Sequence, residues 1–441
     1  MSEWIKTTLS EIADIRISNV DKKSCQGEEP VMLCNYMDVY SNDYINHNIS
    51  FMEATANIME IAKFTVSKGD VLITKDSETP FDIGIPSVVE EDIDNLICGY
   101  HLAQLKPDLK KVDPFFLAKK LALPEVSSYF SKVAAGSTRY GLSRGSIANV
   151  LISLPSLEKQ KKIASILKKL DVAIAKTEEI INKYNQIKKG MMCDLFSRGL
   201  NKDGSLRESY ESSPDLYQET VIGMIPKEWS LQPLSSIAYY QHGRPFPSSD
   251  YTDEGVFLLR PGNLDHNGFV RFDEGHSIKI PYHWEELEPN YVVRYGDILM
   301  NLTAQSLDDE FLGRVCINLE KTKSLLNQRI ARFSTNKIEH EFLYWLLRSR
   351  QFRKQIDRTS QGTKVQHLYN RDLNRIVLGI PSCAEEQRKI SASLRAISKK
   401  IKTEEEHLQK ILKNKLGLMQ DLLTEKVPVK VKEKNTEKTN V

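Results

Sequence analysis

Basic side chains are unevenly distributed along this chain. The chain has 61 Lys and Arg against 59 Asp and Glu, so its net charge is only +2. Between Tyr344 and Arg375, however, there are eight basic residues and two acidic ones, whereas residues 76–94 hold seven acidic residues and no basic one. Such segregation is typical of a protein that binds a polyanion on one face. On charge alone, solvated helix faces are an equally good interpretation.

Two glycine-containing turns add residues that could contact a phosphate. Residues 136–141 read Gly-Ser-Thr-Arg-Tyr-Gly, and residues 362–367 read Gly-Thr-Lys-Val-Gln-His. Because glycine has no side chain, its backbone can approach a phosphate closely. Lys and Arg supply the charge that phosphates need, and Arg, Lys, Asn and Gln can discriminate base edges.

Motifs that would carry catalysis are missing. The sequence has no Gly-x4-Gly-Lys-Ser/Thr loop for nucleotide phosphates and no His-Glu-x2-His. It also lacks the Asn/Asp-Pro-Pro-aromatic motif with which adenine methyltransferases hold an extruded base. The string 107–110, Pro-Asp-Leu-Lys, resembles a piece of a nuclease metal site but is common by chance. The six cysteines lie far apart, so we interpret them as buried thiols in a reducing compartment. We predict no catalytic residue and no metal site.

An internal duplication organises the chain. Four pairs of segments recur in the same order, with an offset of 225 to 227 residues. They are Trp4–Ala13 with Trp229–Ala238, Gly69–Ile73 with Gly296–Met300, Gly136–Thr138 with Gly362–Lys364, and Leu154–Ser156 with Ile380–Ser382.

Each half follows one plan. Short apolar runs such as VLIT at 71–74 and VFLL at 256–259 predict strands joined by long loops. An amphipathic helix is expected near 114–133 and near 341–357, and a proline-containing turn then leads into a long helix. The predicted divisions are domain 1 at 1–153, spacer helix 1 at 154–197, a connector at 198–225, domain 2 at 226–379, spacer helix 2 at 380–426, and a charged, disordered tail at 427–441.

The long helices carry a heptad pattern that predicts a coiled coil. Polar residues interrupt the pattern at equivalent positions, Thr177 with Glu404 and Lys188 with Lys415. Alternatively, the first helix ends or frays near Lys188. The apolar seam consists of Ile163, Leu167, Leu170, Ile174, Ile181, Ile390, Leu394, Ile397, Ile401 and Leu408.

Duplicated halves tend to be related by a pseudo-two-fold axis, which would make the two helices antiparallel. The predicted fold is therefore α+β, with two duplicated domains separated by two long antiparallel coiled-coil helices.

In these residues the chain resembles the specificity subunits of type I restriction-modification enzymes. The resemblance lies in Gly223–Trp229 (GMIPKEW), in Asn35–Tyr40 (NYMDVY), in the Gly-Asp-Val/Ile-Leu strands and in the Gly-Ser/Thr turns. It continues with the glutamines that follow the prolines at the long-helix starts and with Leu418–Thr424 (LMQDLLT). No single motif is specific, but their order, twice over, covers nearly the whole chain. The Trp4 segment departs from the pattern because it lacks the Gly-x-Ile-Pro lead-in.

The resemblance implies a division of labour between subunits. Each domain would be a target-recognition domain that reads one half of a bipartite, asymmetric site in double-stranded DNA. The helices would set the gap between the half-sites and dock two methyltransferase subunits. Those partners would bind S-adenosylmethionine and methylate adenine, while restriction subunits, which use ATP and Mg, would cleave the DNA. The chain itself would be non-catalytic. With no signal sequence and no membrane-spanning run, we expect it in the cytoplasm.

Recognition domains of this family diverge strongly, so the resemblance transfers no individual DNA contact. We choose candidates by their chemistry and their expected place in loops. For any one of them, a solvated loop side chain is at least as good an interpretation. The candidates are Lys75, Arg139, Tyr140 and Arg144 in the first half, and Arg244, Arg260, Asn263, Lys364, Gln366 and His367 in the second.

Two other classes of function stay open. One is a coiled-coil scaffold that joins protein partners without reading DNA; the basic, aromatic-flanked segment 344–375 argues against it. The other is a methyltransferase or nuclease fused into one chain, which the missing motifs disfavour.

The helices are predicted to act as a ruler. Inserting seven residues after Ile181, with a matching insertion after Leu408, keeps every apolar residue on its face. The insertion adds about 10 Å of helix, or roughly three base pairs, and rotates one half-site by roughly 100°. We expect a wider gap, unchanged half-site sequences and weaker binding, measured as the methylated motif. A folded, active variant that kept the original gap would contradict the ruler.

Overall fold

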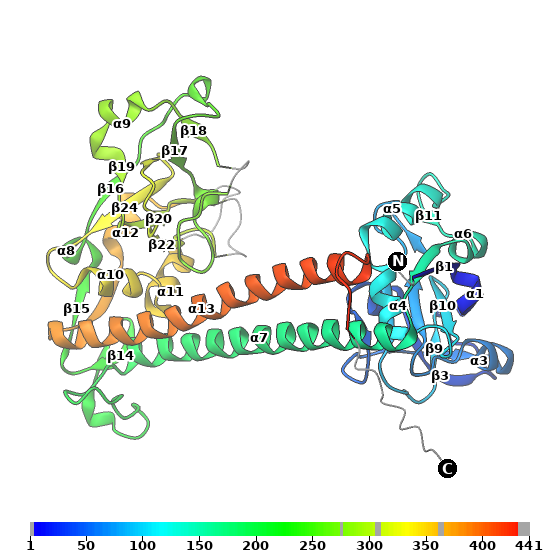
Figure 1. The fold of residues 1–441 in the computed structure, drawn as a ribbon. Helices are drawn as coiled ribbons and strands as arrows, with labels where there is room; N and C mark the ends of the chain where they lie inside the picture. Colours follow the sequence, from blue (N-terminus) through cyan, green and yellow to red (C-terminus); the bar gives the residue numbers. More distant parts are fainter. Residues whose placement is uncertain (1–3, 274–276, 305–309, 360–365, 431–441) are drawn as a thin grey trace, which may run out of the picture. The chain divides into compact units, whose positions relative to one another are not determined.

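The computed structural model describes residues 4–273, 277–304, 310–359 and 366–430 (Figure 1). It divides into a first unit, residues 1–178 with 406–441, and a second unit, residues 179–405. Both boundaries fall inside the long helices α7 (Leu157–Ser197) and α13 (Ala384–Leu423). Each unit therefore contains one half of each long helix.

The first unit is built on two sheets. The larger has the order β2-β10-β6-β8-β4, and the smaller has the order β5-β3-β9. The central strand β6 is buried along its whole length, as its apolar sequence predicts. The strands are β1 (Ile5–Thr8), β2 (Ala13–Ile17), β3 (Glu29–Cys34), β4 (Tyr44–Ile45), β5 (Met52–Ala56), β6 (Val71–Thr74), β7 (Asp76–Ser77), β8 (Pro86–Val89), β9 (Leu96–Cys98), β10 (Leu102–Pro107), β11 (Tyr140–Gly141) and β12 (Leu151–Leu154).

The short helices of this unit pack beside the sheets, and the antiparallel pair β1·β12 leads into α7. They are α1 (Leu9–Ile12), α2 (Tyr36–Tyr40), α3 (Ile58–Phe64), α4 (Pro114–Leu121), α5 (Pro124–Val133) and α6 (Arg144–Ala148). The single amphipathic helix predicted over 114–133 is wrong. It is broken at Leu123, whose backbone is extended, because a residue that precedes proline is driven out of the helical region.

The second unit repeats this plan with sheets of order β16-β24-β20-β22 and β18-β17-β23-β19. Its strands are β13 (Tyr217–Thr220), β14 (Gly223–Pro226), β15 (Trp229–Pro233), β16 (Tyr239–His242), β17 (Val256–Leu259), β18 (Lys279–Ile280), β19 (Val292–Val293), β20 (Ile298–Asn301), β21 (Thr303–Ala304), β22 (Val315–Ile317), β23 (Ser324–Leu326), β24 (Ile330–Ser334), β25 (Gln366–His367) and β26 (Val377–Pro381). Its helices before α13 are α8 (Leu234–Ile237), α9 (His283–Leu287), α10 (His340–Leu346), α11 (Arg350–Thr359) and α12 (Asn370–Arg375).

Predicted strands in both units are confirmed, whereas the helix predicted in the second unit is wrong. The strand predicted at 256–259 is β17, and the strand predicted at 71–74 is β6, so both are confirmed. The one helix predicted over 341–357 is wrong, because α10 and α11 are separate helices. Four single-turn 3-10 helices, η1 (Pro214–Leu216), η2 (Ser248–Asp250), η3 (Pro261–Asn263) and η4 (Pro289–Tyr291), complete the regular elements among the described residues.

The halves of α7 and α13 lie side by side and antiparallel within each unit (Figure 1). In the first unit, Leu167 shares a core with Leu422, and Lys415 meets Asp171. In the second unit, Leu195 shares a core with Ile390, and the Lys400 ammonium lies 5.9 Å from the Tyr184 ring centre. The predicted fold class, α+β with duplicated domains and two long antiparallel helices, is confirmed. Because α7 continues to Ser197, the alternative end near Lys188 is wrong.

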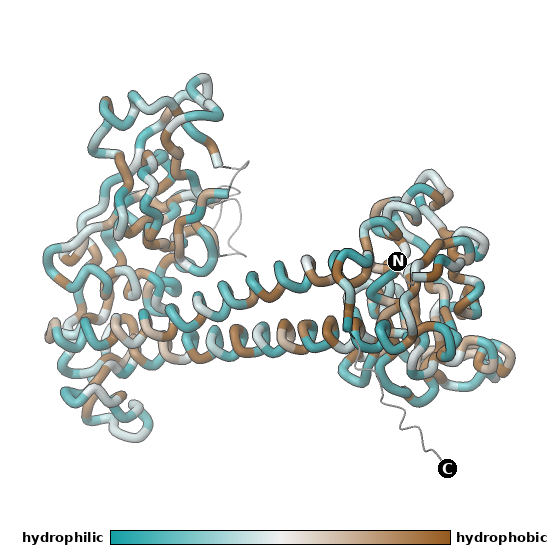
Figure 2. The backbone as a smooth tube through the Cα atoms, viewed as in Figure 1, coloured by the Kyte–Doolittle hydropathy of each residue, from teal (hydrophilic) through white to brown (hydrophobic). Residues whose placement is uncertain are grey.

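The predicted seam residues face inward to different degrees. Figure 2 shows apolar segments recurring among hydrophilic ones along both helices. Half-buried members are Leu170, Ile174, Ile181 and Leu408. Buried members are Ile163, Leu167, Ile390, Leu394, Ile397 and Ile401.

Equivalent glutamines attach each long helix to its domain. Gln160 accepts a hydrogen bond from the Asp113 amide at 2.9 Å and donates to the Pro155 carbonyl at 2.9 Å. Gln387 does the same with the Glu339 amide and the Pro381 carbonyl, at 2.9 Å each. The glutamine of the helix-start motif therefore links the long helix to the helix α4 or α10 that precedes it.

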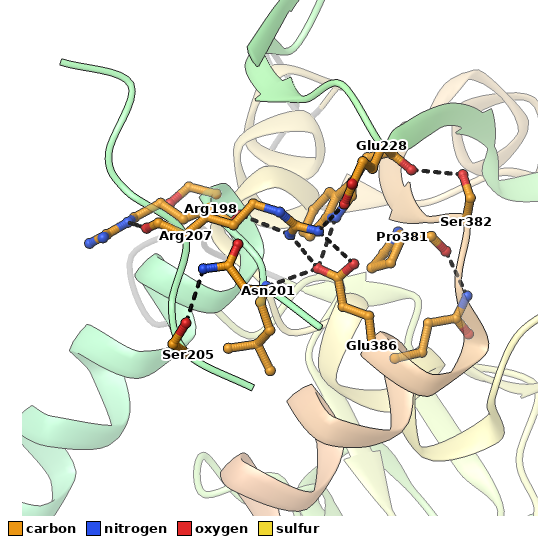
Figure 3. Close-up of polar contacts among 12 residues, drawn as sticks. Arg198, Asn201, Ser205, Arg207, Glu228, Pro381, Ser382 and Glu386 are labelled. Atoms are coloured by element: carbon orange, nitrogen blue, oxygen red, sulfur yellow. Dashed lines mark hydrogen bonds and ion pairs between the residues drawn. The ribbon is translucent and has the colours of Figure 1, made fainter. Parts of the chain in front are cut away.

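A buried ion pair adds a further attachment in the second unit (Figure 3). The Arg207 guanidinium donates to both oxygens of Glu386, at 2.5 and 3.0 Å, and to Glu228 at 2.6 Å. Glu386 also accepts from the Trp229 indole at 3.1 Å and from the Leu200 amide at 2.9 Å. The connector, the entry to domain 2 and the start of α13 thus meet at one carboxylate.

The two polar interruptions of the seam at Lys188 and Lys415 have opposite surroundings. Lys415 lies 2.6 Å from Asp171 and 3.2 Å from Asp43, and Lys119 bridges the same two carboxylates at 2.8 and 2.7 Å. Burial opposes the charged form, but these carboxylates raise the pKa of Lys415.

Among the described residues, Lys188 forms no such ion pair with a carboxylate. The positions equivalent to Lys119 and Asp171 are Trp345 and Ser398, and the Lys188 ammonium lies 5.3 Å from the Trp345 ring centre. Burial, with a smaller effect of Arg348, lowers the pKa of Lys188 to about 8.

These surroundings predict opposite effects for two matched variants. K415M should lower the free energy of unfolding by about 3 kcal/mol or less, because it removes one of the two ammonium partners of Asp171, which keeps Lys119 and the Tyr44 hydroxyl. K188M should raise the free energy of unfolding, because it removes a half-buried charge whose pKa is lowered by burial. Below pH 8, Lys188 is protonated in both the folded and the unfolded chain, so the full free-energy cost of holding its charge in the folded chain is present. Between pH 8 and 10.5 the folded chain loses the proton first, so this cost falls as the pH rises.

Thermal or urea unfolding of both variants from pH 7 to 10 measures this difference. The gap between K188M and the parent chain should close as the pH rises. Equal destabilisation by the two substitutions would contradict the assignment.

Candidate nucleic-acid interface

Three segments of the first unit cross beside the end of β6. The Lys75 amide donates to the His101 carbonyl at 2.9 Å, and the Leu142 amide donates to the Lys75 carbonyl at 2.8 Å. Next to this crossing, β7 and β11 form a two-stranded ribbon in which Ser77 pairs with Tyr140 and Asp76 pairs with Gly141. The residue after β6, the residue before β10 and the residues after the glycine turn are therefore neighbours.

The glycine turn that precedes β11 is tightly closed. Ala135 and Gly141 exchange backbone hydrogen bonds of 2.9 and 3.1 Å. Gly136 has a φ of +143°, and a Cβ atom there would lie 1.8 Å from the Arg139 carbonyl oxygen. Only glycine fits this position without a shift of the backbone. The turn leaves Arg139 exposed next to the ribbon.

Asp76 lies at the centre of the polar side chains around this ribbon. Its carboxylate is 2.6 Å from the Lys75 ammonium and 2.9 Å from His101 Nδ1. Asp76, His101 and Arg139 line one groove of about 800 Å³, together with Lys22 and Tyr36. The groove therefore combines hydrogen-bond donors, acceptors and aromatic faces, the groups that contact nucleic-acid bases and phosphates.

The second unit repeats the crossing with the same backbone hydrogen bonds. The Leu302 amide donates to the Arg329 carbonyl at 2.9 Å, and the Leu368 amide donates to the Leu302 carbonyl at 2.9 Å. The ribbon β21·β25 pairs Thr303 with His367 and Ala304 with Gln366. By position, Leu302 replaces Lys75, Thr303 replaces Asp76, Arg329 replaces His101 and His367 replaces Gly141. The backbone is kept while the side chains differ.

Histidine and tyrosine dominate the second ribbon. His367 Nδ1 lies 3.0 Å from the Thr303 hydroxyl, and the His367 ring is 4.8 Å from the half-exposed Tyr369 ring. The Arg371 guanidinium lies 5.4 Å from the same tyrosine ring. Burial and the neighbouring His242 lower the pKa of His367. A neutral imidazole therefore lies beside an exposed aromatic ring and a cation.

The structure brings together five of the residues chosen from the sequence. Lys75, Arg139 and Tyr140 surround the first ribbon, while Gln366 and His367 form β25 in the second. Lys364 lies outside the described residues.

Four other candidates have different surroundings. Arg144 lies on α6, donates to the Ile15 carbonyl at 3.0 Å and lines a separate groove. Arg244 forms an ion pair with Glu288 and lies 5.2 Å from the Trp284 ring centre.

Asn263 uses its amide within its own loop. It accepts from the Arg260 amide at 2.9 Å and donates to Arg271 and Ser277 at 3.1 and 3.2 Å. Arg260 is exposed next to η3. The interface proposed below is built on the two ribbons, so it does not include these four residues.

Four residues in or beside the ribbons were not predicted from the sequence: Asp76, His101, Thr303 and Arg329. Each lies near its partners only because strands distant in sequence pair in space. A signal existed for two of them, because Asp76 and Thr303 follow the repeated Gly-Asp-Val/Ile-Leu segment at the same offset.

The interpretation that the sequence lacks a Gly-x-Ser-x-Gly string is wrong, because residues 141–145 read Gly-Leu-Ser-Arg-Gly, a spacing that occurs in serine hydrolases. Its serine, Ser143, is the N-cap of α6 and accepts from the Ser146 amide at 3.0 Å. A capping role explains this residue.

Neither a metal-binding cluster nor a membrane-spanning helix occurs among the described residues. No cluster of three or more His, Cys, Asp or Glu there could hold a metal ion. No helix in this part of the chain is both long and apolar enough to cross a membrane. The prediction that all six thiols are buried is wrong, because Cys25, Cys193 and Cys383 are exposed. Burial raises the pKa of Cys316 to about 12.

Comparison with known proteins gives a consistent result. The family model for the type I restriction modification DNA specificity domain matches residues 1–187 and again residues 226–413. The chain is similar to the type I restriction enzyme MjaVIII specificity subunit of Methanocaldococcus jannaschii, with 27% identity across 92% of this chain and 91% of the relative. It is also similar to the putative MjaX specificity subunit of the same organism, with 27% identity over 84% of this chain and 81% of that protein.

The fold is similar to that of the type I restriction-modification S subunit from M. genitalium. The TM-score is 0.58 at 16% identity, and the match covers 98% of this chain and 97% of the other. The likeness in fold therefore extends over both units.

The glycine turn yields a test of the first ribbon. Gly136→Ala should displace the Arg139 carbonyl and weaken DNA binding by the first domain by about 1–3 kcal/mol, as R139A should. Gly204→Ala is a matched control, because Gly204 also has a positive φ but an added Cβ there meets no atom within 4 Å. DNA affinity and thermal unfolding are measured for each variant. Full DNA affinity of a folded G136A chain would remove this turn from the interface.

Proposed function

We propose that the two domains of this chain read the two halves of a bipartite DNA target. The proposal follows from the family, because this chain belongs to the type I restriction-modification DNA specificity domains. The chain is thus a specificity subunit, a non-catalytic class of protein. Each ribbon, β7·β11 and β21·β25, is the proposed centre of one reading surface.

The observation that carries this proposal is the repeated backbone crossing with different side chains. Asp76 and Thr303 occupy the same place in the two ribbons, and His101 and Arg329 occupy the same place in the crossings, yet these side chains differ in charge and in hydrogen-bonding groups. Hydrogen bonds between backbone groups maintain the scaffold, so side chains are free to differ without loss of the fold. Because base edges are distinguished by the pattern of donors and acceptors that meets them, two different side-chain sets imply two different half-sites. The proposed target is therefore asymmetric.

The electrostatics of the ribbons suit base reading combined with phosphate contact. In the first, Asp76 partly neutralises Lys75, so the exposed Arg139 is the freer cation for a phosphate. In the second, Arg329 is exposed at the position of His101. Binding should therefore weaken as salt rises, since each phosphate contact releases counterions.

The long helices are the proposed docking site for two methyltransferase subunits, and restriction subunits would join that assembly. S-adenosylmethionine, ATP and Mg would be bound by those partners and not by this chain. The complex would act in the cytoplasm, where the DNA is. The M. jannaschii relatives that support this assignment are named as subunits of type I restriction enzymes.

Exchanging one domain tests independent reading. Residues 1–153 are replaced by the equivalent domain of a family member with another target, and the chain is assembled with its methyltransferase partner. The junction after residue 153 falls one residue before the end of β12 at Leu154, and α7 begins at Leu157, so the exchange leaves the long helix intact. Sequencing of the methylated bases should show one changed half-site and one unchanged half-site.

The reciprocal exchange of residues 226–379 is the matched control and should change the other half. If both halves changed together, the domains would not read DNA independently. A parent complex that methylated without any sequence preference would favour the scaffold that joins proteins without reading DNA.

A further inference from the structure

One histidine in each unit is held by its Nδ1 atom at the same point of the ribbon. Asp76 accepts from His101 Nδ1 at 2.9 Å in the first unit, and the Thr303 hydroxyl lies 3.0 Å from His367 Nδ1 in the second. Asp76 and Thr303 are equivalent by the repeat, but the histidines are not. His101 precedes β10, whereas His367 lies in β25. The two units therefore reach one arrangement with histidines from different segments.

Holding Nδ1 leaves the opposite ring nitrogen for another molecule. Among the residues that the structure describes, neither His101 nor His367 has a hydrogen-bond partner at Nε2. The His101 side chain is 24% exposed and lines the same groove as Arg139. A carboxylate can only accept, so His101 donates from Nδ1 and its ring orientation is set.

Two other histidines of the second unit differ in this respect. Nε2 of His242 lies 2.6 Å from the Asn370 side-chain oxygen. Nε2 of His340 lies 2.9 Å from the Gly296 carbonyl. Both rings use Nε2 inside the protein, so they keep no such group for a ligand.

We propose that His101 and His367 are base-reading residues and that Asp76 and Thr303 are the positioning residues that orient them. This inference rests on the proposed function, because it assumes that the ribbons face DNA. A neutral ring that donates from Nδ1 keeps a lone pair on Nε2, which can accept from adenine N6 or cytosine N4 in the major groove. Because the ring is held, it favours one base position over its neighbours.

Asparagine and serine substitutions distinguish a base-reading role of these residues from a purely structural role. An asparagine side chain can replace Nδ1 but has no atom at the place of Nε2, so H101N and H367N keep the inner contact and remove the reading atom. In the second unit, T303V removes the orienting hydroxyl at nearly constant shape, and T303S restores it. H47N is the control, because His47 lies outside the groove with its side chain 63% exposed.

The experiment uses the full chain assembled with its methyltransferase partner. Affinity is measured for the preferred duplex and for duplexes that carry each single base-pair change. H101N should lose about tenfold discrimination at one base pair of one half-site, and H367N at one base pair of the other. T303V should reproduce the H367N pattern, whereas T303S and H47N should match the parent.

Loss of discrimination confined to one base pair supports the proposal, because a structural role would weaken all duplexes alike. A uniform loss of affinity, or no change in either histidine variant, would overturn it while leaving the proposed function intact. If T303S failed to restore what T303V removed, Thr303 would not be a positioning residue. A parent complex without sequence preference would instead contradict the proposed function.

Discussion

Antiparallel packing of the long helices is the constraint on which both units depend. The core of the first unit contains Leu167 from α7 and also Leu422 and Leu423 from the end of α13. The core of the second contains Ile390 and Leu394 from α13 with Leu195 and Phe196 from the end of α7. Each domain therefore buries apolar surface against a helix end that follows the other domain in sequence. Neither half of the duplicated sequence encodes a complete core by itself.

Polar contacts refine this packing differently in the two units. In the first, Lys120 donates to the Leu423 carbonyl at 2.6 Å. A cation at the C-terminal end of a helix interacts favourably with the negative end of the helix dipole. In the second, Glu386 accepts from Arg207 and from the Trp229 indole, and Arg207 also donates to Glu228. Removing one partner of a buried ion pair leaves a charge uncompensated, so such contacts fix a geometry more strongly than they add stability. The two halves thus attach the long helices to the domains through different polar groups.

The two ribbon crossings show the opposite balance, because their backbone hydrogen bonds recur while their side chains differ. These crossings are maintained by backbone hydrogen bonds at Lys75 and Leu302, which any residue except proline can make. Leu142, Leu302 and Leu368 at these crossings belong to the buried cores. Asp76, His101, Thr303 and Arg329 lie outside the cores, so their identities can change at small cost to folding. This separation of scaffold from side chain explains how one fold can present different sets of donors and acceptors.

The sequence alone determined the duplication, the fold class and the long helices, because these follow from offsets and heptad spacing that do not depend on distant contacts. It also located the glycine turn at 136–141, since a positive φ and a close approach both require glycine. Only the tertiary structure decided which polar residues meet. Asp76 and His101 are 25 residues apart and meet because a strand pairing sets Lys75 beside His101. Arg244 and Asn263 had the right chemistry, but Glu288 and the surrounding loop occupy their hydrogen-bonding groups. Spacing along a chain carries periodicity, whereas the partners of a polar group depend on which strands pair.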